Sequence, residues 1–277
     1  MLQETIEYFL QCPMYQKENW IDFESEISNV IQSIDADMKN SGAKLDNDVS
    51  TVSNIYLEKF FHKRLPAALL DFDQSVDIIT YREIRDILYK DLNKLIRAFE
   101  IYLDDYVDKI ELMNRLEKIE KLEIDHVLSF NYSHTYQKYY DKTKKIQYDY
   151  IHGEVKGNDT AENNNMVLGI DEYLVDEKKN QETDFIAFKK FYQRIYKATG
   201  SEYRNWVDEI RSSRYANEVA LREQFPKQIP YEKFNCKHNV YIFGHSLDIT
   251  DKDVLRDFIL NDNVYTTIYY YSKDVMG

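Results

Sequence analysis

The chain is poor in the residues that punctuate turns and cross-link strands. Its 277 residues include only 7 glycines, 4 prolines and 2 cysteines. So few glycines and prolines favour long helices over a turn-rich β fold. Cys12 and Cys236 lie far apart in the sequence and match no metal-binding spacing. This use of cysteine is typical of a reduced, cytoplasmic protein.

Long apolar runs and basic stripes are also missing. No segment reaches the apolar length needed to cross a bilayer, and residues 1–30 carry charges throughout, unlike a signal peptide. The formal net charge of -13 argues against nucleic acid as the primary partner. No His-Glu-x-x-His motif, pair of Cys-x-x-Cys motifs or spaced carboxylate set indicates a bound metal. We therefore expect a cytoplasmic protein that uses no metal and binds neither membranes nor nucleic acid.

The first part of the chain has the spacing of amphipathic helices. Apolar residues recur three and four positions apart between residues 77 and 120, which predicts one or two long helices. Further helices are expected at 1–11, from 19 to about 34 and at 55–70, and a polar surface loop at 35–53. The long helices of residues 55–120 can offer a surface to a partner or to a second copy of the chain.

After residue 120 the apolar period shortens and strands alternate with helices. We expect strands at 125–130, 146–151, 166–170, 238–243 and 265–271. The helices expected between them are 133–140, opening on a serine or threonine cap, 182–225, and 251–260, capped by Thr250 or Asp251. This alternation predicts an α/β fold with a parallel sheet. Residues 1–120 would be mainly helical and residues 121–277 would hold the sheet, the two parts forming one domain.

Two of these strands end in polar residues that suit a binding site. Asn131 follows the apolar run that ends at Phe130, and His152-Gly153 follows the next strand. In an open α/β sheet, ligands bind at the carboxyl ends of the strands. An amide can both donate to and accept from a ribose hydroxyl, and a histidine can act as a general base near neutral pH. The alternatives are a turn asparagine that bonds its own backbone and a histidine satisfied by a carbonyl group.

A third strand end carries the turn Gly244-His245-Ser246-Leu247-Asp248. Backbone amides of such a turn can hold a phosphate or sugar oxygen, and Asp248 or Asp251 can accept from a ribose hydroxyl. Alternatively, Ser246 or Asp248 caps the following helix. The turn is not the Gly-x-Ser-x-Gly nucleophile elbow, because position 248 is aspartate. Asp171 ends the expected strand 166–170 in the same way, where a turn or cap role is the simpler reading.

Taken together, these motifs resemble the AbiH family of bacterial phage abortive-infection proteins. The matching pieces follow the family's order: Trp20-Ile-Asp-Phe-Glu24, Ser129-Phe-Asn-Tyr-Ser133, Ile151-His-Gly153, Leu168-Gly-Ile-Asp171 and Ile242-Phe-Gly-His-Ser-Leu247, with Asp251 after the last. The family is in turn similar to sirtuin-like domains that process NAD. The resemblance implies a Rossmann-like, sirtuin-like parallel sheet with a large helical insertion.

The resemblance also implies roles for individual residues. His152 would act on the nicotinamide ribose and Asn131 would orient the ribose or a water, so that both would be catalytic. Residues implied to contact the nucleotide are Tyr132, Gly153, Asp171, Gly244, His245, Ser246 and Asp251. NAD would then be the substrate, and the activity would be that of an NAD glycohydrolase.

One part of the family pattern is missing from this sequence. AbiH-like chains usually begin with a strand and a Gly-Asn-Gly-Phe-Asp turn, which approaches the pyrophosphate in a dinucleotide-binding sheet. Here Met1-Leu-Gln-Glu already corresponds to the following helix, and no Gly-x-Gly occurs. We expect either that the start of the coding sequence was assigned at an internal position or that the protein is a naturally shortened homologue. A homologue without the phosphate loop that only binds partners is therefore the alternative to an NAD-cleaving effector, and a nuclease ranks last.

Overall fold

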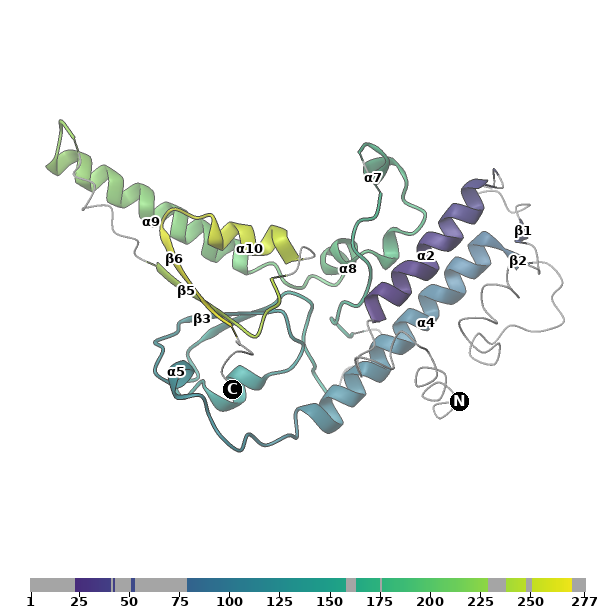
Figure 1. Cartoon of the computed structure of the whole chain (residues 1–277), viewed down its shortest axis with the longest axis horizontal. Coiled ribbons are helices and arrows are strands. Elements are labelled where there is room, and N and C mark those ends of the chain that lie inside the picture. Colours follow the sequence, from purple (N-terminus) through teal and green to yellow (C-terminus); the bar gives the residue numbers. More distant parts are fainter. Residues whose placement is uncertain are drawn as a thin grey trace, which may run out of the picture. The chain divides into compact units, whose positions relative to one another are not determined.

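The computed structural model (Figure 1) describes residues 23–40, 42, 51–52, 79–157, 163–174, 176–228, 238–247 and 251–270. The helices predicted at 1–11 and 55–70 and the segment 20–22 of the Trp20 motif lie outside these residues. No helix within the described part of the chain is long and apolar enough to cross a membrane.

The chain divides into two compact units that each draw on two stretches of sequence. Residues 1–110 and 155–197 form the first unit, and residues 111–154 and 198–277 form the second. The His152 and Gly244 motifs therefore belong to the same unit, whereas Asp171 belongs to the other.

Two antiparallel helices organise the first unit, α2 (Phe23–Asn40) and α4 (Tyr81–Tyr102), drawn side by side in Figure 1. The Tyr81 hydroxyl at the start of α4 donates to the Asp37 carboxylate near the end of α2, at 2.5 Å. The prediction of a loop from residue 35 was wrong, because α2 continues to Asn40. Its last turns are held by buried Met38 and by Asp35, which accepts from the Tyr173 hydroxyl at 3.3 Å.

The start of α4 is fixed by a capping box that follows the short antiparallel pair β1 (Thr51–Val52) and β2 (Ile79–Thr80). The Thr80 hydroxyl accepts from the Glu83 backbone N–H at 3.2 Å, and the Glu83 carboxylate accepts from the Thr80 N–H at 2.8 Å. After α4 comes a π-helical turn, η2 (Leu103–Val107). The predicted helical region of 77–120 is therefore confirmed for its first half only, and the next helix is the single turn α5 (Glu117–Glu120).

A buried carboxylate ties α4 to the segment after residue 155. Glu100 is fully buried, and its carboxylate accepts from the Arg97 guanidinium, from the Asn164 amide at 2.5 Å and from the Lys156 N–H at 3.5 Å. Nearby, burial lowers the pKa of Lys197 to about 8, although the charge of Glu100 acts in the opposite direction. These contacts put charged groups in the interior of the first unit.

The predicted strand at 166–170 is reduced to a single parallel bridge between Ile170 and Lys189. Side chains rather than a neighbouring strand satisfy much of this backbone. The Leu168 carbonyl accepts from the Gln193 amide at 3.0 Å, the Met166 carbonyl accepts from Lys197, and the Met166 N–H donates to Asn164. The segment is buried and extended, but it is not part of a ladder.

Two parallel strand pairs form the sheet part of the second unit, which gives a mixed α/β fold. β3 (His126–Ser129) pairs with β4 (Gln147–Tyr150), and β5 (His238–Phe243) pairs with β6 (Val264–Tyr269). Four of the five predicted strands are thus confirmed, and both pairings are parallel. Within the described residues the two pairs remain separate two-stranded sheets.

The helical region predicted at 182–225 is broken into pieces. The structure has α7 (Lys178–Gln181), the 3-10 turn η3 (Ile186–Phe188), α8 (Lys190–Tyr196) and α9 (Tyr203–Gln224). Ala198 and Gly200 between α8 and α9 have φ of 49° and 63°. A right-handed helix cannot pass through such residues. The buried Asp149 carboxylate in β4 accepts from the Tyr203 N–H at 2.8 Å, so β4 caps the start of α9.

The core of the second unit forms where α9 and α10 (Lys252–Ile259) meet the end of β4; the two helices run side by side in Figure 1. The buried residues of this cluster are Ile151, Tyr203, Trp206, Val207 and Val254, with Leu128, Phe130 and Phe258 packed against them. This core holds the carboxyl ends of β3 and β4 against both helices, immediately beside His152.

Candidate functional site

Asn131 and His152 leave the sheet at equivalent positions. The last paired residues of β3 and β4 are Ser129 and Tyr150, and each candidate lies two residues further on. The Ser129 hydroxyl donates to the Asn131 carbonyl at 2.9 Å and accepts from the Asn131 N–H at 3.2 Å. A serine therefore makes the turn, and the exposed Asn131 side chain has no hydrogen-bond partner among the described residues.

His152 sits in a rigid, buried turn. The Gly153 N–H donates to the Tyr150 carbonyl at 3.0 Å, and Gly153 has φ of 79°, a conformation that glycine adopts without strain. The preceding residue, Ile151, is fully buried against α9. The Thr199 hydroxyl also donates to the Tyr150 carbonyl, at 3.2 Å. The backbone on both sides of His152 is therefore fixed.

A single carboxylate faces two histidines in this unit. Asp251 Oδ1 lies 3.4 Å from His152 Nε2, and Asp251 Oδ2 lies 3.3 Å from His245 Nε2. All three side chains are largely buried, with 15%, 10% and 11% of the Asp251, His152 and His245 side chains exposed. Asp251 is the N-cap residue of α10, but its side chain makes no capping bond. The predicted capping of α10 by the Asp251 side chain was therefore wrong, because its carboxylate faces the two histidines instead.

His245 is held by the turn that follows β5. Gly244 and Leu247 have φ of 66° and 58°, and the Leu247 N–H donates to His245 Nδ1 at 2.8 Å. A Cβ added at Gly244 would meet no atom within 4 Å, so one side of this turn is open. Ser246 is exposed at the same turn, while Asp248 and Thr250 lie outside the described residues.

Aromatic rings line the two histidines. The Phe130 ring makes edge contacts with His245 at 4.4 Å and His152 at 6.2 Å between centroids, and Tyr132 lies 6.3 Å from His152. Phe130 and Tyr132 flank Asn131 in the sequence. The end of β3 therefore faces the histidines that end β4 and β5.

His152 has one nitrogen in use and one without a partner. Its Nε2 faces Asp251, whereas its Nδ1 is buried and has no hydrogen-bond partner within the described residues. Within the described residues, His152 is therefore not satisfied by a backbone carbonyl, which was the alternative to a functional role. A buried nitrogen without a partner costs about 1–3 kcal/mol unless a ligand completes its hydrogen bond.

The other three histidines of the described residues have structural contacts. His134 Nε2 lies 3.1 Å from the Glu154 carboxylate, and His238 Nε2 lies 2.9 Å from the Ser213 hydroxyl. The His126 ring lies tilted against Trp206, with 4.7 Å between the ring centroids. His134 is therefore paired with an acidic side chain. It is also the N-cap residue of α6 (Thr135–Tyr139) and makes no side-chain capping bond, so the serine or threonine cap predicted there is absent.

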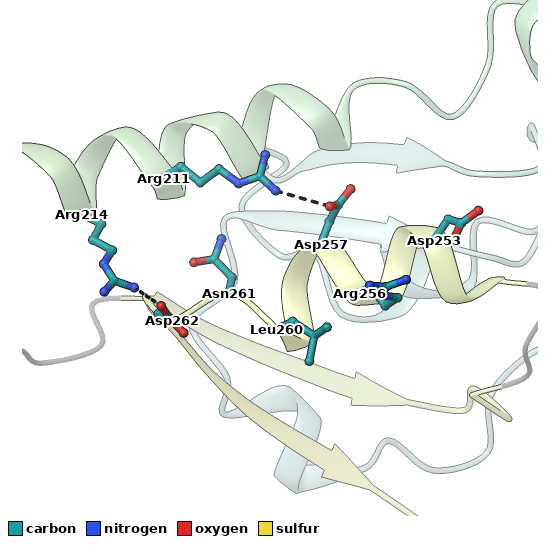
Figure 2. A pocket seen from close by; sticks show the side chains of 8 residues that line it. All are labelled: Arg211, Arg214, Asp253, Arg256, Asp257, Leu260, Asn261 and Asp262. Carbon is teal, nitrogen blue, oxygen red and sulfur yellow. Dashed lines mark hydrogen bonds and ion pairs between the residues drawn. The ribbon is translucent and has the colours of Figure 1, made fainter.

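A cavity of about 580 Å³ in this unit is lined by none of His152, His245 and Asp251 (Figure 2). Its walls come from α9, from α10 and from the turn before β6. Three arginines and three aspartates line it. Ion pairs join Arg211 to Asp257 at 3.4 Å and Arg214 to Asp262 at 2.7 Å. Asp262 precedes β6, so the cavity lies at the amino end of that strand, whereas the His245 turn follows the carboxyl end of β5. Its charges largely neutralise one another.

The structure brings most of the predicted site residues together but not all. Asn131, Tyr132, His152, Gly153, Gly244, His245, Ser246 and Asp251 follow strand ends or begin α10 in one unit. Asp171 lies in the other unit, next to the Ile170 bridge. The contact of Asp251 with both histidines was not predicted, because the six-residue step from 245 to 251 contains a turn whose geometry the sequence does not specify. Within the described residues no cluster of three histidine, cysteine or acidic side chains fits a metal.

Comparison with known proteins identifies the family. No curated protein and no solved structure matches the chain. The sequence model described as bacteriophage abortive infection AbiH matches residues 1–271, nearly the whole length, and includes every motif discussed above. The chain therefore belongs to the bacteriophage abortive infection AbiH family.

Proposed function

We propose that this AbiH-family chain is a phage-defence effector that binds NAD at the His152 edge and hydrolyses it. The observation that carries the proposal is the buried His152 ring, with Nε2 against Asp251 and Nδ1 without a partner among the described residues. A carboxylate orients such a ring, and the nitrogen without a partner is the atom proposed to take a substrate proton.

The strand arrangement supports a Rossmann-like, sirtuin-like cleft. Both strand pairs are parallel, and the ends of β3, β4 and β5 carry Asn131, His152 and His245. In doubly wound α/β folds the ligand lies outside the carboxyl ends of the strands. The His152 and His245 rings from two strand ends both contact the Phe130 ring that follows a third strand, an arrangement suited to hold a nucleotide.

The proposed reaction uses water and needs no metal. The bond between the nicotinamide nitrogen and the ribose C1′ breaks, with its electron pair leaving on nicotinamide. A water oxygen forms the new bond to C1′ and loses a proton. His152 Nδ1 accepts a proton from a ribose hydroxyl or from the water, and the exposed Asn131 amide orients that group. The products are nicotinamide, ADP-ribose and one proton.

Release of nicotinamide from NAD tests the proposal directly. The protein is incubated with NAD, with and without extract of phage-infected cells to supply a trigger, and nicotinamide is measured by chromatography. We expect turnover that His152→Ala reduces at least about 100-fold, within the range for loss of a general base. His134→Ala, whose ring pairs with Glu154, is the matched control and should retain activity. The same assay is run on a version extended by the family's amino-terminal strand and turn. If neither protein releases nicotinamide under either condition, the enzymatic proposal is overturned.

A protein that only binds is the second candidate. It is favoured by the apolar side chains exposed at the end of α4 and just after it, Ile101, Tyr102, Tyr106 and Ile110, which offer a surface to a partner. Calorimetric titration with NAD or ADP-ribose that shows binding without nicotinamide release would support it. If His152→Ala abolished protection against phage while the variant remained folded, an interaction role independent of this site would be excluded.

A further inference from the structure

The carboxylate of Asp251 joins two strand ends that are far apart in the sequence. It begins α10, and its two oxygens face His152 after β4 and His245 after β5. From the sequence, His152 was expected to act on the ribose, and His245 and Asp251 were expected to contact the nucleotide. The geometry instead shows one cluster in which the aspartate lies between two imidazoles.

The proton position on His245 follows from its turn. Its Nδ1 accepts a hydrogen bond from the Leu247 N–H at 2.8 Å, so this nitrogen carries no proton. In the neutral ring the proton must then be on Nε2, which lies 3.3 Å from Asp251 Oδ2. In this tautomer the Nε2–H is the group of His245 that faces the carboxylate, and the ring has no nitrogen left for a ligand.

The proton position on His152 follows from the same carboxylate. Its Nε2 lies 3.4 Å from Asp251 Oδ1, and a lone pair pointing at a carboxylate oxygen would be repelled. The proton of the neutral ring is thus favoured on Nε2. This leaves the lone pair on Nδ1, the buried atom that has no partner within the described residues.

We propose that Asp251 and His245 are positioning residues that hold His152 in the Nε2–H tautomer, so that Nδ1 is the base of the site. His245 fixes one oxygen of the carboxylate, and the other oxygen fixes the ring of His152. Phe130 contacts both rings and restricts their rotation. The role of Nδ1 in catalysis rests on the proposed NAD hydrolysis, whereas the tautomer assignment does not.

Replacing the carboxylate by an amide has an asymmetric consequence. In Asp251→Asn, the His245 Nε2–H still donates to the amide oxygen, because Leu247 keeps His245 Nδ1 as an acceptor. The amide NH₂ then faces His152 Nε2 and needs an acceptor there. His152 should therefore change to the Nδ1–H tautomer, and its base would be lost.

Nuclear magnetic resonance of the ring nitrogens tests this without any substrate. Long-range ¹H–¹⁵N spectra of the ¹⁵N-histidine-labelled chain, assigned with His152→Gln and His245→Gln, report the tautomer of each ring. We expect Nε2–H for both rings in the native chain, and a change to Nδ1–H for His152 alone in Asp251→Asn. The matched control is Asp253→Asn, an exposed aspartate two residues further along α10. A native His152 in the Nδ1–H form, or a His152 tautomer unchanged by Asp251→Asn, would overturn the proposal.

Kinetics supply the second readout. In hydrolase triads, asparagine in place of the orienting aspartate lowers kcat by about 10⁴ because the imidazole takes the wrong tautomer. We expect Asp251→Asn to lower kcat for nicotinamide release by about 10²–10⁴, with KM changed less than about threefold.

His245→Gln, whose amide can still donate to Asp251, should keep more activity than His245→Ala. A rise in KM with kcat unchanged would show instead that Asp251 binds the nucleotide. If the native chain releases no nicotinamide, the proposed function fails while the tautomer measurement still decides this proposal.

Discussion

At the scale of single residues, the backbone beside His152 leaves no room for a side chain at position 200. A Cβ built on Gly200 would lie 2.4 Å from the Ile151 carbonyl oxygen and 2.7 Å from its Cα, and Gly200 has φ of +63°. We predict that Gly200→Ala lowers the free energy of unfolding by about 3 kcal/mol, from backbone strain and overpacking together. Urea denaturation followed by circular dichroism measures this change.

Gly244→Ala is the matched stability control for Gly200→Ala. Gly244 has nearly the same φ, +66°, but an added Cβ would meet nothing within 4 Å. Only the conformational cost should remain, about 1 kcal/mol. Equal losses in the two variants would show that Ile151 can shift to make room.

At the scale of elements, the start of α4 depends on two reciprocal hydrogen bonds. Thr80→Ala removes the hydroxyl that accepts from the Glu83 N–H. We predict a loss of about 1 kcal/mol in the free energy of unfolding, the usual effect of losing an N-cap side chain. Glu83→Gln keeps an acceptor oxygen for the Thr80 N–H and should lose less. A larger loss in Glu83→Gln than in Thr80→Ala, by urea denaturation, would contradict a capping box of this kind.

The secondary-structure elements also show where a local apolar pattern is sufficient to predict a strand or a helix. The local apolar patterns predicted β3, β4, β5 and β6. In the structure β3 pairs with β4 and β5 pairs with β6 through backbone hydrogen bonds. The pattern failed at 166–170, where the side chains of Gln193, Lys197 and Asn164 take the backbone hydrogen bonds. It failed again at 198–201, because Ala198 and Gly200 have φ of 49° and 63°, which interrupt a helical pattern that the sequence continues.

At the scale of the whole molecule, the division into two compact units allows the effect of a substitution on one unit to be compared with its effect on the other. Glu100→Ala would leave Arg97, the Asn164 amide and the Lys156 N–H without their buried acceptor. We predict a loss of about 3 kcal/mol, typical of removing one partner of a buried charged group. Hydrogen exchange followed by mass spectrometry should show faster exchange in 81–102 and 155–170, with α9 of the second unit unchanged.

The control for Glu100→Ala is Glu117→Ala. Glu117 is 80% exposed and pairs with Lys121, which is 76% exposed. Exposed ion pairs contribute between about 0 and 1 kcal/mol, so this variant should exchange as the native chain does. Equal acceleration of exchange in both units by Glu100→Ala would show that they unfold together.

The sequence alone determined the parallel strands of the second unit, the strand-end positions of Asn131, His152 and Gly244, and the AbiH family. These depend on local apolar patterns and on short motifs, which are properties of neighbouring residues. Only the tertiary structure decided that Asp251 faces two histidines rather than capping α10, that His152 keeps Nδ1 without a partner among the described residues, and that Asp171 belongs to another unit. Such contacts join residues up to about a hundred positions apart. They depend on how turns and helices pack, which no local pattern of residues specifies.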